Sequence, residues 1–501
     1  MKSIKVLLTL FSIIVFISCG RDDGKIAFTF LQVNDVYEIA PIQGGKYGGM
    51  ARLETVHQEL MNENENTFVM MAGDFLNPSL LGTIKYKGDR IRGRQMVEVM
   101  NAMNFELAAF GNHEFDLSKN DLQKRINEST FSWIGANVAL NLDGNTESFF
   151  KKVSGEKKSI PKTHTISVKD ADGTTIKIGF ISVCIPSNPR SYVAYSDMFE
   201  EAKASYESLK DGVDVVFGLT HVNIKHDKRI AEMLPDIPLI MGGHEHTNIK
   251  HQVGNTMITK ADANAKTAYI HKITFDKKTK KTNVVSKLRE INETIETDPK
   301  VGGIVDRWQV VLNTKIKEII ANPNEVIYNA KEPLDGRDTP IRSTQTNLGK
   351  LVTASMAFAF DNKVDGALVN GGSIRIDDEL KGDVTSTDVF RVLPFGGSVY
   401  KIEIKGSLLE EVLNFGKQAK GKGAYLQRFN ISEKENNWVI NKQKLNPNKT
   451  YTIAVSDYLM KGFDIPMLTE KAPGVISVYK PSTTELGYDI RKAVIHFLRA
   501  Q

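Results

Sequence analysis

The stretch GNHEFD at residues 111–116 decides the fold, because it gathers an amide, an imidazole and two carboxylates directly behind the short apolar run Leu107–Phe110. A second stretch of this kind, GGHEH at residues 242–246, follows the apolar run Ile237–Met241. Side chains two residues apart on an extended chain point the same way, so the two histidines of the second stretch present both imidazoles on one side. The pattern predicts β-strands that end in metal-capable side chains.

Between residues 25 and 241 one pattern recurs: an apolar, β-rich run ends in polar residues, and a helical segment follows. The further apolar runs are Ile26–Val33, Phe68–Met71, Phe131–Ala136, Ile176–Val183 and Val213–Leu219. The helical segments are Met50–Asn62, Asp89–Met103, Ser118–Asn127, Asp197–Lys210 and Lys225–Leu234. Near-continuous apolar strands are typical of sheets covered on both faces, so we expect an α/β layered domain.

Metal-capable side chains fall at the carboxyl ends of the predicted strands, where ligands bind in α/β sheets. They are Asp35, Asp74, Asn112 with His113, His221, and His244 with His246. Mixed carboxylate, amide and imidazole ligands suit Zn, Mn or Fe better than Mg alone. Taken singly, each has an ordinary structural explanation, since an aspartate after a strand commonly caps a helix and a lone histidine is commonly a satisfied buried one.

The chain is long enough for two domains, because its 501 residues exceed the roughly 250–300 at which a single core stops growing. The polar segment Asp298–Ile320 carries apolar residues at helical spacing and ends at Asn322-Pro323-Asn324, so we expect a helical connector. Helices near Thr346–Phe360 and Ser407–Lys417, with strands around Val399–Ile404 and Tyr451–Val455, predict a second mixed α/β unit. The expected divisions are a domain at 20–297, a connector at 298–324 and a domain at 325–501.

The N-terminus predicts export. Two lysines precede an apolar run, Val6–Ile17, that is too short to span a bilayer and is typical of a signal peptide. The run ends in Ser18-Cys19, which resembles the lipobox of bacterial lipoproteins. We expect residues 1–19 to be a lipoprotein signal peptide and a lipid on Cys19 to anchor the protein in a bacterial cell envelope, facing the periplasm or the exterior. An ordinary secretory signal is the alternative. Cys184 then has no disulfide partner and is expected to be a small buried side chain.

In order, these motifs resemble the bacterial 5′-nucleotidase/UDP-sugar hydrolase family, within the calcineurin-like metallophosphoesterases. The N-terminal motifs that carry the resemblance are GGMARL (48–53), GD (73–74), GNHEFD (111–116) and GGHEH (242–246). The resemblance implies a four-layer α/β/β/α sandwich followed by a second, smaller mixed α/β nucleotide-binding domain. It also implies two divalent or mixed-valence metal ions, of zinc, manganese, iron or cobalt.

The resemblance further implies a role for each motif residue. The implied ligands are Asp35, Asp74 and His246 for one ion, and Asp74, Asn112, His221 and His244 for the other. His113 and Asp116 resemble the family's catalytic pair, in which the histidine faces the phosphate and the aspartate orients it. Glu114 and Glu245 match no family ligand. Two such ions would lower the pKa of a bound water and neutralise charge on the phosphate.

One N-terminal position departs from the family, which normally carries aspartate-x-histidine after the first strand. This chain has Asp35-Val36-Tyr37, and Tyr37 still points to the same side as Asp35. A phenolate can bind trivalent iron, and some metallophosphoesterases use a tyrosine in this way, although from another strand. Tyr37 therefore either touches the first metal or its water, or is a spectator beside a weakly held ion.

The C-terminal part resembles the nucleotide-binding domain of the same family in RSTQTNLG (342–349), NGGSIR (370–375), LPFG (393–396) and SDYLMKGFD (456–464). In that family two aromatic rings sandwich the base, an aspartate contacts the ribose, and arginines with an asparagine hold polar groups of the substrate. The matching positions are Phe395 and Tyr458, then Asp464, then Arg342, Arg375 and Asn370. The family's aspartate usually follows two glycines, so Phe463 in this chain is expected to reshape the base pocket.

We therefore expect an exported, metal-dependent phosphoric ester hydrolase that converts nucleoside 5′-monophosphates to nucleosides and phosphate. Two alternatives remain: a hydrolase of cyclic nucleotides or nucleotide sugars, and a nucleotide-binding lipoprotein with an impaired metal site. The net charge of +5 is small for this length, and the one basic run, Lys277–Lys281, is typical of a solvated hairpin. Binding to a nucleic acid polymer is not expected.

Overall fold

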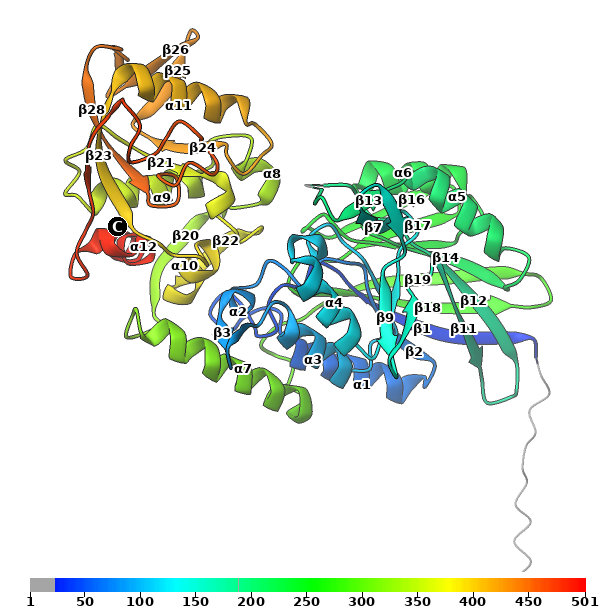
Figure 1. Ribbon diagram of the computed structural model, residues 1–501. Helices are drawn as coiled ribbons and strands as arrows, with labels where there is room; N and C mark the ends of the chain where they lie inside the picture. Colours follow the sequence, from blue (N-terminus) through cyan, green and yellow to red (C-terminus); the bar gives the residue numbers. More distant parts are fainter. Residues whose placement is uncertain (1–22, 188) are drawn as a thin grey trace, which may run out of the picture.

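The computed structural model describes residues 23–187 and 189–501 and arranges them in two parts (Figure 1). The expected signal peptide, with Cys19, lies outside the described residues. The N-terminal part contains two six-stranded sheets, and the C-terminal part contains a five-stranded sheet. Across the described ranges, no helix combines the length and the apolar character that crossing a membrane requires.

The first six-stranded sheet places several parallel strand ends at one edge. Its strands are β1 (Lys25–Val33), β2 (Thr67–Met71), β5 (Leu107–Ala109), β6 (Ser132–Ile134), β18 (Thr267–Asp276) and β19 (Lys281–Glu290). Their order is β19-β18-β1-β2-β5-β6. Strands β1, β2, β5 and β6 run parallel, so the loops after them share one edge, whereas β18 and β19 pair antiparallel.

The second six-stranded sheet repeats this arrangement. Its strands are β11 (Thr163–Lys169), β12 (Thr175–Ile181), β14 (Val215–Thr220), β15 (Leu239–Gly242), β16 (Ile249–Val253) and β17 (Thr256–Lys260). Their order is β11-β12-β14-β15-β17-β16. Strands β12, β14, β15 and β17 are parallel, and antiparallel β11 and β16 form the edges.

The two sheets pack face to face, with helices on their outer faces. Phe30 of the first sheet meets Phe217 of the second, with ring centroids 5.3 Å apart. Because strand side chains alternate, Leu31 and Val69 point to the opposite face and pack against helices. The covering helices are α1 (Met50–Glu63), α3 (Arg94–Ala102) and α4 (Lys119–Glu128) on the first sheet, and α5 (Met198–Leu209) and α6 (Ile224–Met233) on the second. This order confirms the α/β/β/α sandwich.

One expected helix is shorter than its sequence pattern indicated. Residues 89–90 of the expected helix Asp89–Met103 form β4 (Asp89–Arg90), which pairs antiparallel with β3 (Lys85–Tyr86). That hairpin takes the first residues of the segment, so α3 begins at Arg94. The remaining short elements of this domain are α2 (Leu80–Thr83), the 3-10 helix η1 (Glu114–Asp116), β7 (Val138–Leu142), β8 (Asn145–Glu147), β9 (Phe150–Val153), β10 (Glu156–Ser159) and β13 (Val193–Tyr195).

The C-terminal domain is built on a five-stranded sheet. Its strands are β21 (Gly366–Asn370), β23 (Val399–Lys405), β24 (Leu426–Phe429), β28 (Thr450–Ser456) and β29 (Val475–Tyr479), in the order β24-β21-β28-β23-β29. Its helices are α8 (Asp338–Ile341), α9 (Asn347–Phe358), α10 (Ser386–Val392), α11 (Gly406–Gln418) and α12 (Ile490–Arg499), with 3-10 turns η2 (Gly371–Ser373) and η3 (Leu486–Tyr488). Smaller strands are β20 (Val326–Asp335), β22 (Glu379–Thr385), β25 (Ile431–Lys434), β26 (Asn437–Ile440) and β27 (Gln443–Lys444).

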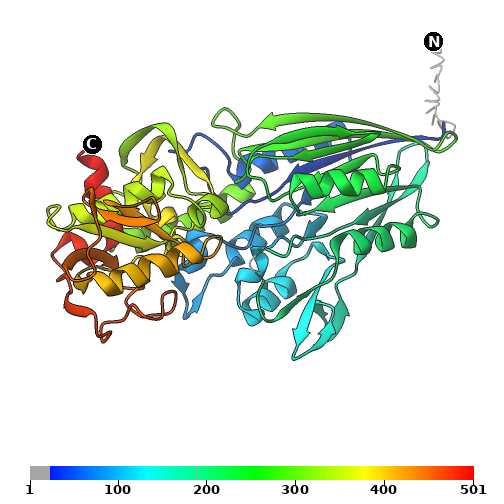
Figure 2. The ribbon, with the colours of Figure 1, turned by 90° about the horizontal axis from the view of Figure 1, so that it is seen from above.

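Helix α7 (Pro299–Lys317) lies between the two parts in the chain and packs against α1 and α3. The Asp298 side chain accepts a hydrogen bond from the backbone N–H of Val301 and caps the helix. Figure 2 shows β1 running from the far end of the molecule toward the C-terminal domain. The carboxyl ends of the parallel strands therefore face the second domain, and the site forms there.

Candidate metal centre and active site

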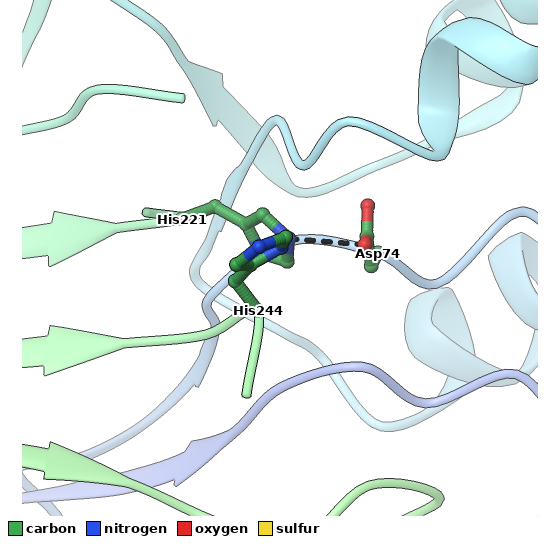
Figure 3. Close-up of side chains that lie close together, drawn as sticks. All are labelled: Asp74, His221 and His244. Carbon is green, nitrogen blue, oxygen red and sulfur yellow. Dashed lines mark ion pairs between the residues drawn. The ribbon is translucent and has the colours of Figure 1, made fainter. Parts of the chain in front are cut away.

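Three side chains from three separate strand ends meet at one point. Asp74 follows β2, His221 follows β14 and His244 follows β15. One ligating atom from each residue lies within 4.8 Å of the others, and Figure 3 shows both imidazoles beside the carboxylate of Asp74. Two imidazoles and a carboxylate at this spacing fit a cation of the zinc, manganese or iron type.

The ligand-bearing loops have unusual backbone conformations. Asp35, Asp74 and His244 adopt φ angles of +53°, +56° and +82°, in the left-handed region that non-glycine residues rarely occupy. Strain of this kind persists where the surrounding structure fixes it, and it gathers at functional sites. These bends follow β1, β2 and β15, and the side chains of Asp74 and His244 meet at the candidate metal site.

Two glycines allow the loops to approach one another. A Cβ on Gly111 would lie 2.1 Å from Asp74 Oδ1, and a Cβ on Gly243 would lie 2.2 Å from the carbonyl oxygen of Ala72. Neither position can carry a larger side chain without moving a ligand loop. Glycine before Asn112 and His244 is therefore a geometric requirement of the site.

Several polar atoms of the site are buried without a hydrogen-bond partner within the described residues. They are Asp74 Oδ2, Asn112 Oδ1 and His221 Nε2. His221 Nε2 lies 3.0 Å from Asp74 Oδ2, but the two groups lack hydrogen-bond geometry. His221 Nδ1 donates to the carbonyl of Ala72 at 2.8 Å, which leaves Nε2 as the free lone pair. Unpaired buried atoms are costly unless something binds them, so this donor set fits a metal ion.

A second group of candidate ligands, Asp35 and His246, lies beside the first. Asp35 Oδ1 is 3.4 Å from His246 Nε2, and the Tyr37 hydroxyl lies 3.4 Å from Asp35 Oδ1 and 3.1 Å from His246 Nε2. Asp35 Oδ2 accepts hydrogen bonds from the side chain of Asn34 and the backbone N–H of His244, which leaves Oδ1 facing the site. Tyr37 thus lies among these ligands, as its spacing from Asp35 predicted.

The carboxylates give the centre a strong negative potential. Burial lowers the pKa of His221, but Asp74 and Asp35 outweigh it and raise that pKa to about 9. Burial likewise opposes the charged form of His246, yet Asp377 and Asp35 raise its pKa to about 10. A cation that binds here must displace protons from these imidazoles, so its affinity depends on pH.

His113 and Asp116 form the expected pair at the rim of the centre. His113 Nδ1 and Asp116 Oδ2 are 2.8 Å apart, and Asp116 also accepts hydrogen bonds from Arg190 at 2.5 Å and from Arg375 at 3.0 Å. Burial favours neutral His113, but Asp74 and Asp116 raise its pKa well above the ordinary value. These contacts favour the protonated form of His113 and hold its ring in a fixed orientation.

The C-terminal domain lies against the candidate metal centre and contributes side chains to it. Asp377 Oδ2 lies 3.2 Å from His113 Nε2 and 3.5 Å from His246 Nε2. A cavity of about 280 Å³ separates the domains, and its wall includes Asn112 on one side and Asp338 on the other. Neither Asp377 nor Asp338 was predicted from the sequence, although Asp377 follows the NGGSIR motif by two residues.

Glu114 has a structural role that the motif did not reveal. Its buried carboxylate accepts hydrogen bonds from the backbone N–H groups of Asp74, Phe75, Leu76 and Gly111. These contacts fix the loop after β2 against the loop after β5. Glu114 thus braces the carboxylate of Asp74 without pointing into the centre.

The expected nucleoside residues lie at one end of the C-terminal sheet. The Tyr458 hydroxyl contacts Asp464 Oδ1 at 3.3 Å, and the Asn370 amide donates to Asp464 Oδ2 at 2.7 Å. Val399 at the start of β23 pairs with Ser456 at the end of β28, so the loops carrying Phe395 and Tyr458 leave the same strand pair. Phe395 is 61% exposed, which is unusual for a phenylalanine that serves only a core.

The two expected arginines pair with other carboxylates than Asp464. Arg375 donates to Asp116 across the domain boundary, and Arg342 is buried beside Asp338 at 2.6 Å. Both therefore lie on the side of the C-terminal domain that faces the metal centre. Arg375 also shares a small pocket with Tyr37 and Phe395, which links the metal centre to the exposed ring.

Comparison with known proteins accounts for both domains. Residues 28–248 match the family model described as calcineurin-like phosphoesterase, and residues 326–470 match that of the 5'-nucleotidase C-terminal domain. The chain belongs to the 5′-nucleotidase family of metallophosphoesterases. This 5′-nucleotidase family member is therefore a phosphoric ester hydrolase that binds divalent metal ions, which confirms the resemblance inferred from its motifs.

The sequence identity between this chain and its relatives is moderate. The trifunctional nucleotide phosphoesterase protein YfkN of Bacillus subtilis is 26% identical in an alignment that covers 90% of this chain and 33% of YfkN. The snake venom 5'-nucleotidase of Naja atra is 26% identical in an alignment that covers 88% of this chain and 91% of the venom protein. The chain thus spans about a third of YfkN and nearly all of the venom protein.

Solved structures share the two-domain fold. The 5'-nucleotidase precursor from Thermus thermophilus superposes with a TM-score of 0.65 at 22% identity, covering 95% of this chain and 96% of that one. A sulfate thiohydrolase from the same organism, SoxB, gives a TM-score of 0.63 at 15% identity, covering 94% of each chain. Because proteins named for different reactions share this fold, the substrate has to be argued from the site.

Proposed function

We propose that this hydrolase converts nucleoside 5′-monophosphates to nucleosides and inorganic phosphate at a centre of two metal ions. The observation that carries the proposal is the set of unpaired buried ligand atoms on Asp74, Asn112 and His221, beside a cavity roofed by the nucleotide-binding domain. The donors proposed for the two ions are Asp74, Asn112, His221 and His244 for one, and Asp74, Asp35 and His246 for the other. When bound, such ions supply a nucleophilic water near neutral pH and neutralise phosphate charge.

The protein's own groups position and protonate the substrate. The cavity between Asn112 and Asp338 receives the substrate's phosphate group. When the phosphate binds, it takes the place of Asp377 at His113 Nε2. Protonated His113 then donates from Nε2 to the leaving oxygen, while Asp116 holds Nδ1 and keeps the ring in place. Arg375, which already reaches Asp116, adds positive charge at the same rim.

A phosphate-release assay tests the proposal. We expect release from AMP to require Mn²⁺, Zn²⁺ or Co²⁺ and to stop when EDTA removes the metal. UDP-glucose and 2′,3′-cyclic AMP distinguish the alternatives: faster release of product from either would assign the enzyme to nucleotide sugars or to cyclic nucleotides. AMP that binds tightly but is not hydrolysed with any metal would indicate an impaired centre, in which Tyr37 leaves the first ion weakly held.

A second prediction concerns the base. Replacing Tyr458 by alanine should raise KM for AMP about 5- to 150-fold, because stacking of an aromatic ring on a base contributes about 1–3 kcal/mol. Steady-state kinetics with AMP and with ribose 5-phosphate measures the effect, and the substrate without a base should be unaffected. Tyr479→Ala is the matched control, since Tyr479 is also exposed in this domain. An unchanged KM for AMP in the Tyr458→Ala enzyme would remove this ring from the base site.

The cellular location is a separate proposal. A signal peptide at residues 1–19 and a lipid on Cys19 would place the enzyme outside the cytoplasm, attached to the membrane. The support is the apolar run and the Ser18-Cys19 pair. A location outside the cytoplasm suits the proposed activity, because a nucleoside without its charged phosphate is easier to take up than a nucleotide.

A further inference from the structure

Lys260, the last residue of β17, is completely buried beneath the metal centre. Its ammonium group pairs with the carboxylate of Asp227 at 2.8 Å and with that of Glu245, and it donates to the backbone carbonyls of Val222 at 2.5 Å and Gly243 at 2.7 Å. A buried lysine is rare unless its charge is fully compensated. Here two carboxylates and two carbonyls surround three ammonium protons.

Three of these partners, Val222, Gly243 and Glu245, lie in two ligand loops, whereas Asp227 lies in α6. Val222 directly follows His221, and Gly243 directly precedes His244. Glu245 completes the connection, because its second oxygen accepts a hydrogen bond from the backbone N–H of Ile224 at 2.7 Å. Lys260 and Glu245 therefore hold the loop after β14 and the loop after β15 at a fixed separation.

The contacts of the GGHEH stretch account for the glutamate between its two histidines. His244 and His246 belong to the two groups of candidate ligands, while Glu245 between them contacts Lys260. Asp227 connects Lys260 to β14 as well, because its carboxylate accepts a hydrogen bond at 2.7 Å from the hydroxyl of Thr220, the last residue of that strand. Without the ammonium group, the two carboxylates would lose their positive partner and the carbonyls of Val222 and Gly243 would lose its hydrogen bonds.

We propose that Lys260 and Glu245 are positioning residues that fix His221 and His244 at the spacing required by one of the two metal ions, and so set the affinity of that ion. The inference rests on the proposed two-ion function. Groups that orient metal ligands from behind typically contribute 10–100-fold to metal affinity. Lys260 and Glu245 act on the backbone of the two ligand loops, whereas the usual orienting group is a hydrogen-bond acceptor that contacts the ring of a ligating histidine.

The test is a calorimetric titration of the metal-free enzyme with Co²⁺. Glu245→Gln and Lys260→Met should each weaken one of the two binding events about 10- to 100-fold and leave the other within threefold. Asn112→Ala identifies the affected event, because it removes a proposed ligand of the same ion. At saturating Co²⁺ both variants should recover most of the wild-type kcat. A general loss of stability would instead lower both affinities together.

Lys250→Met is the matched control, because it removes a lysine from the neighbouring strand β16, where Lys250 donates to the carbonyl of Ser286. It should bind Co²⁺ as the wild type does. The inference is wrong if both variants bind the two ions with wild-type affinities. If Lys260→Met does not fold, the Co²⁺ titration of Glu245→Gln alone tests the inference. Fewer than two Co²⁺ bound by the wild type would overturn the proposed function itself, and that result is visible before any variant is made.

Discussion

Replacing Asp74 by asparagine is expected to lower kcat/KM for AMP at least about a thousandfold, because the proposed function assigns Asp74 to both ions and each ion would contribute several kcal/mol of charge stabilisation. An amide offers one oxygen and no charge, so it cannot hold two cations. Elemental analysis of the purified variant should find less than one ion per chain. Activity is measured as phosphate release over a range of Mn²⁺ concentrations, and added metal should restore little of it.

The pH dependence of metal binding gives this prediction a second readout. In the metal-free protein Asp74 helps to raise the pKa of His221 to about 9, so a cation competes with a proton below that pH, and wild-type affinity should rise with pH. Asp74→Asn removes that charge, lowers the pKa of His221 and should flatten this dependence. Asp143→Asn, at an exposed turn, is the control and should behave as wild type. An Asp74→Asn enzyme with two bound ions and near-normal turnover would contradict the assigned role.

The metal ligands could be placed from the sequence because strand ends are local features. An apolar run fixes where each strand stops, and parallel strands put those ends at one edge, so Asp74, His221 and His244 were expected together without any knowledge of loop conformation. The positive φ angles at Asp35 and His244 could not be foreseen, because they arise from how one ligand loop packs on the next.

Contacts between the domains were the part that the sequence could not supply. Asp377 and His113 are far apart in the chain, and nothing in the spacing of either motif says that the two domains close on each other. Lys260 was missed for a similar reason, since one lysine at the end of a strand ordinarily reaches solvent. The bounds of the antiparallel strands β18 and β19 were not predicted, although the basic run Lys277–Lys281, expected on a solvated hairpin, does form the turn that joins them.

Replacing His113 by asparagine should lower kcat for AMP about 10²–10⁴-fold, the usual contribution of a positioned general acid, while KM and metal content change little. In the metal-free protein the pKa of His113 is raised well above its ordinary value, and the carboxylate of Asp116 beside Nδ1 favours the protonated form, which is lost as pH rises. Wild-type kcat should therefore fall on the alkaline side, and the variant should lack that fall. Steady-state kinetics across pH, with metal content measured in parallel, checks both statements.

The leaving group separates general-acid catalysis from simple charge stabilisation by His113. A p-nitrophenolate needs no proton to leave, so p-nitrophenyl phosphate should lose far less rate than AMP in the His113→Asn enzyme if Nε2 donates to the leaving oxygen. Equal losses on both substrates would show that the imidazolium only neutralises phosphate charge. Asp116→Asn should reproduce the pattern in weaker form, because Asp116 acts through the ring of His113, and His251→Asn on the edge strand β16 should leave both rates unchanged.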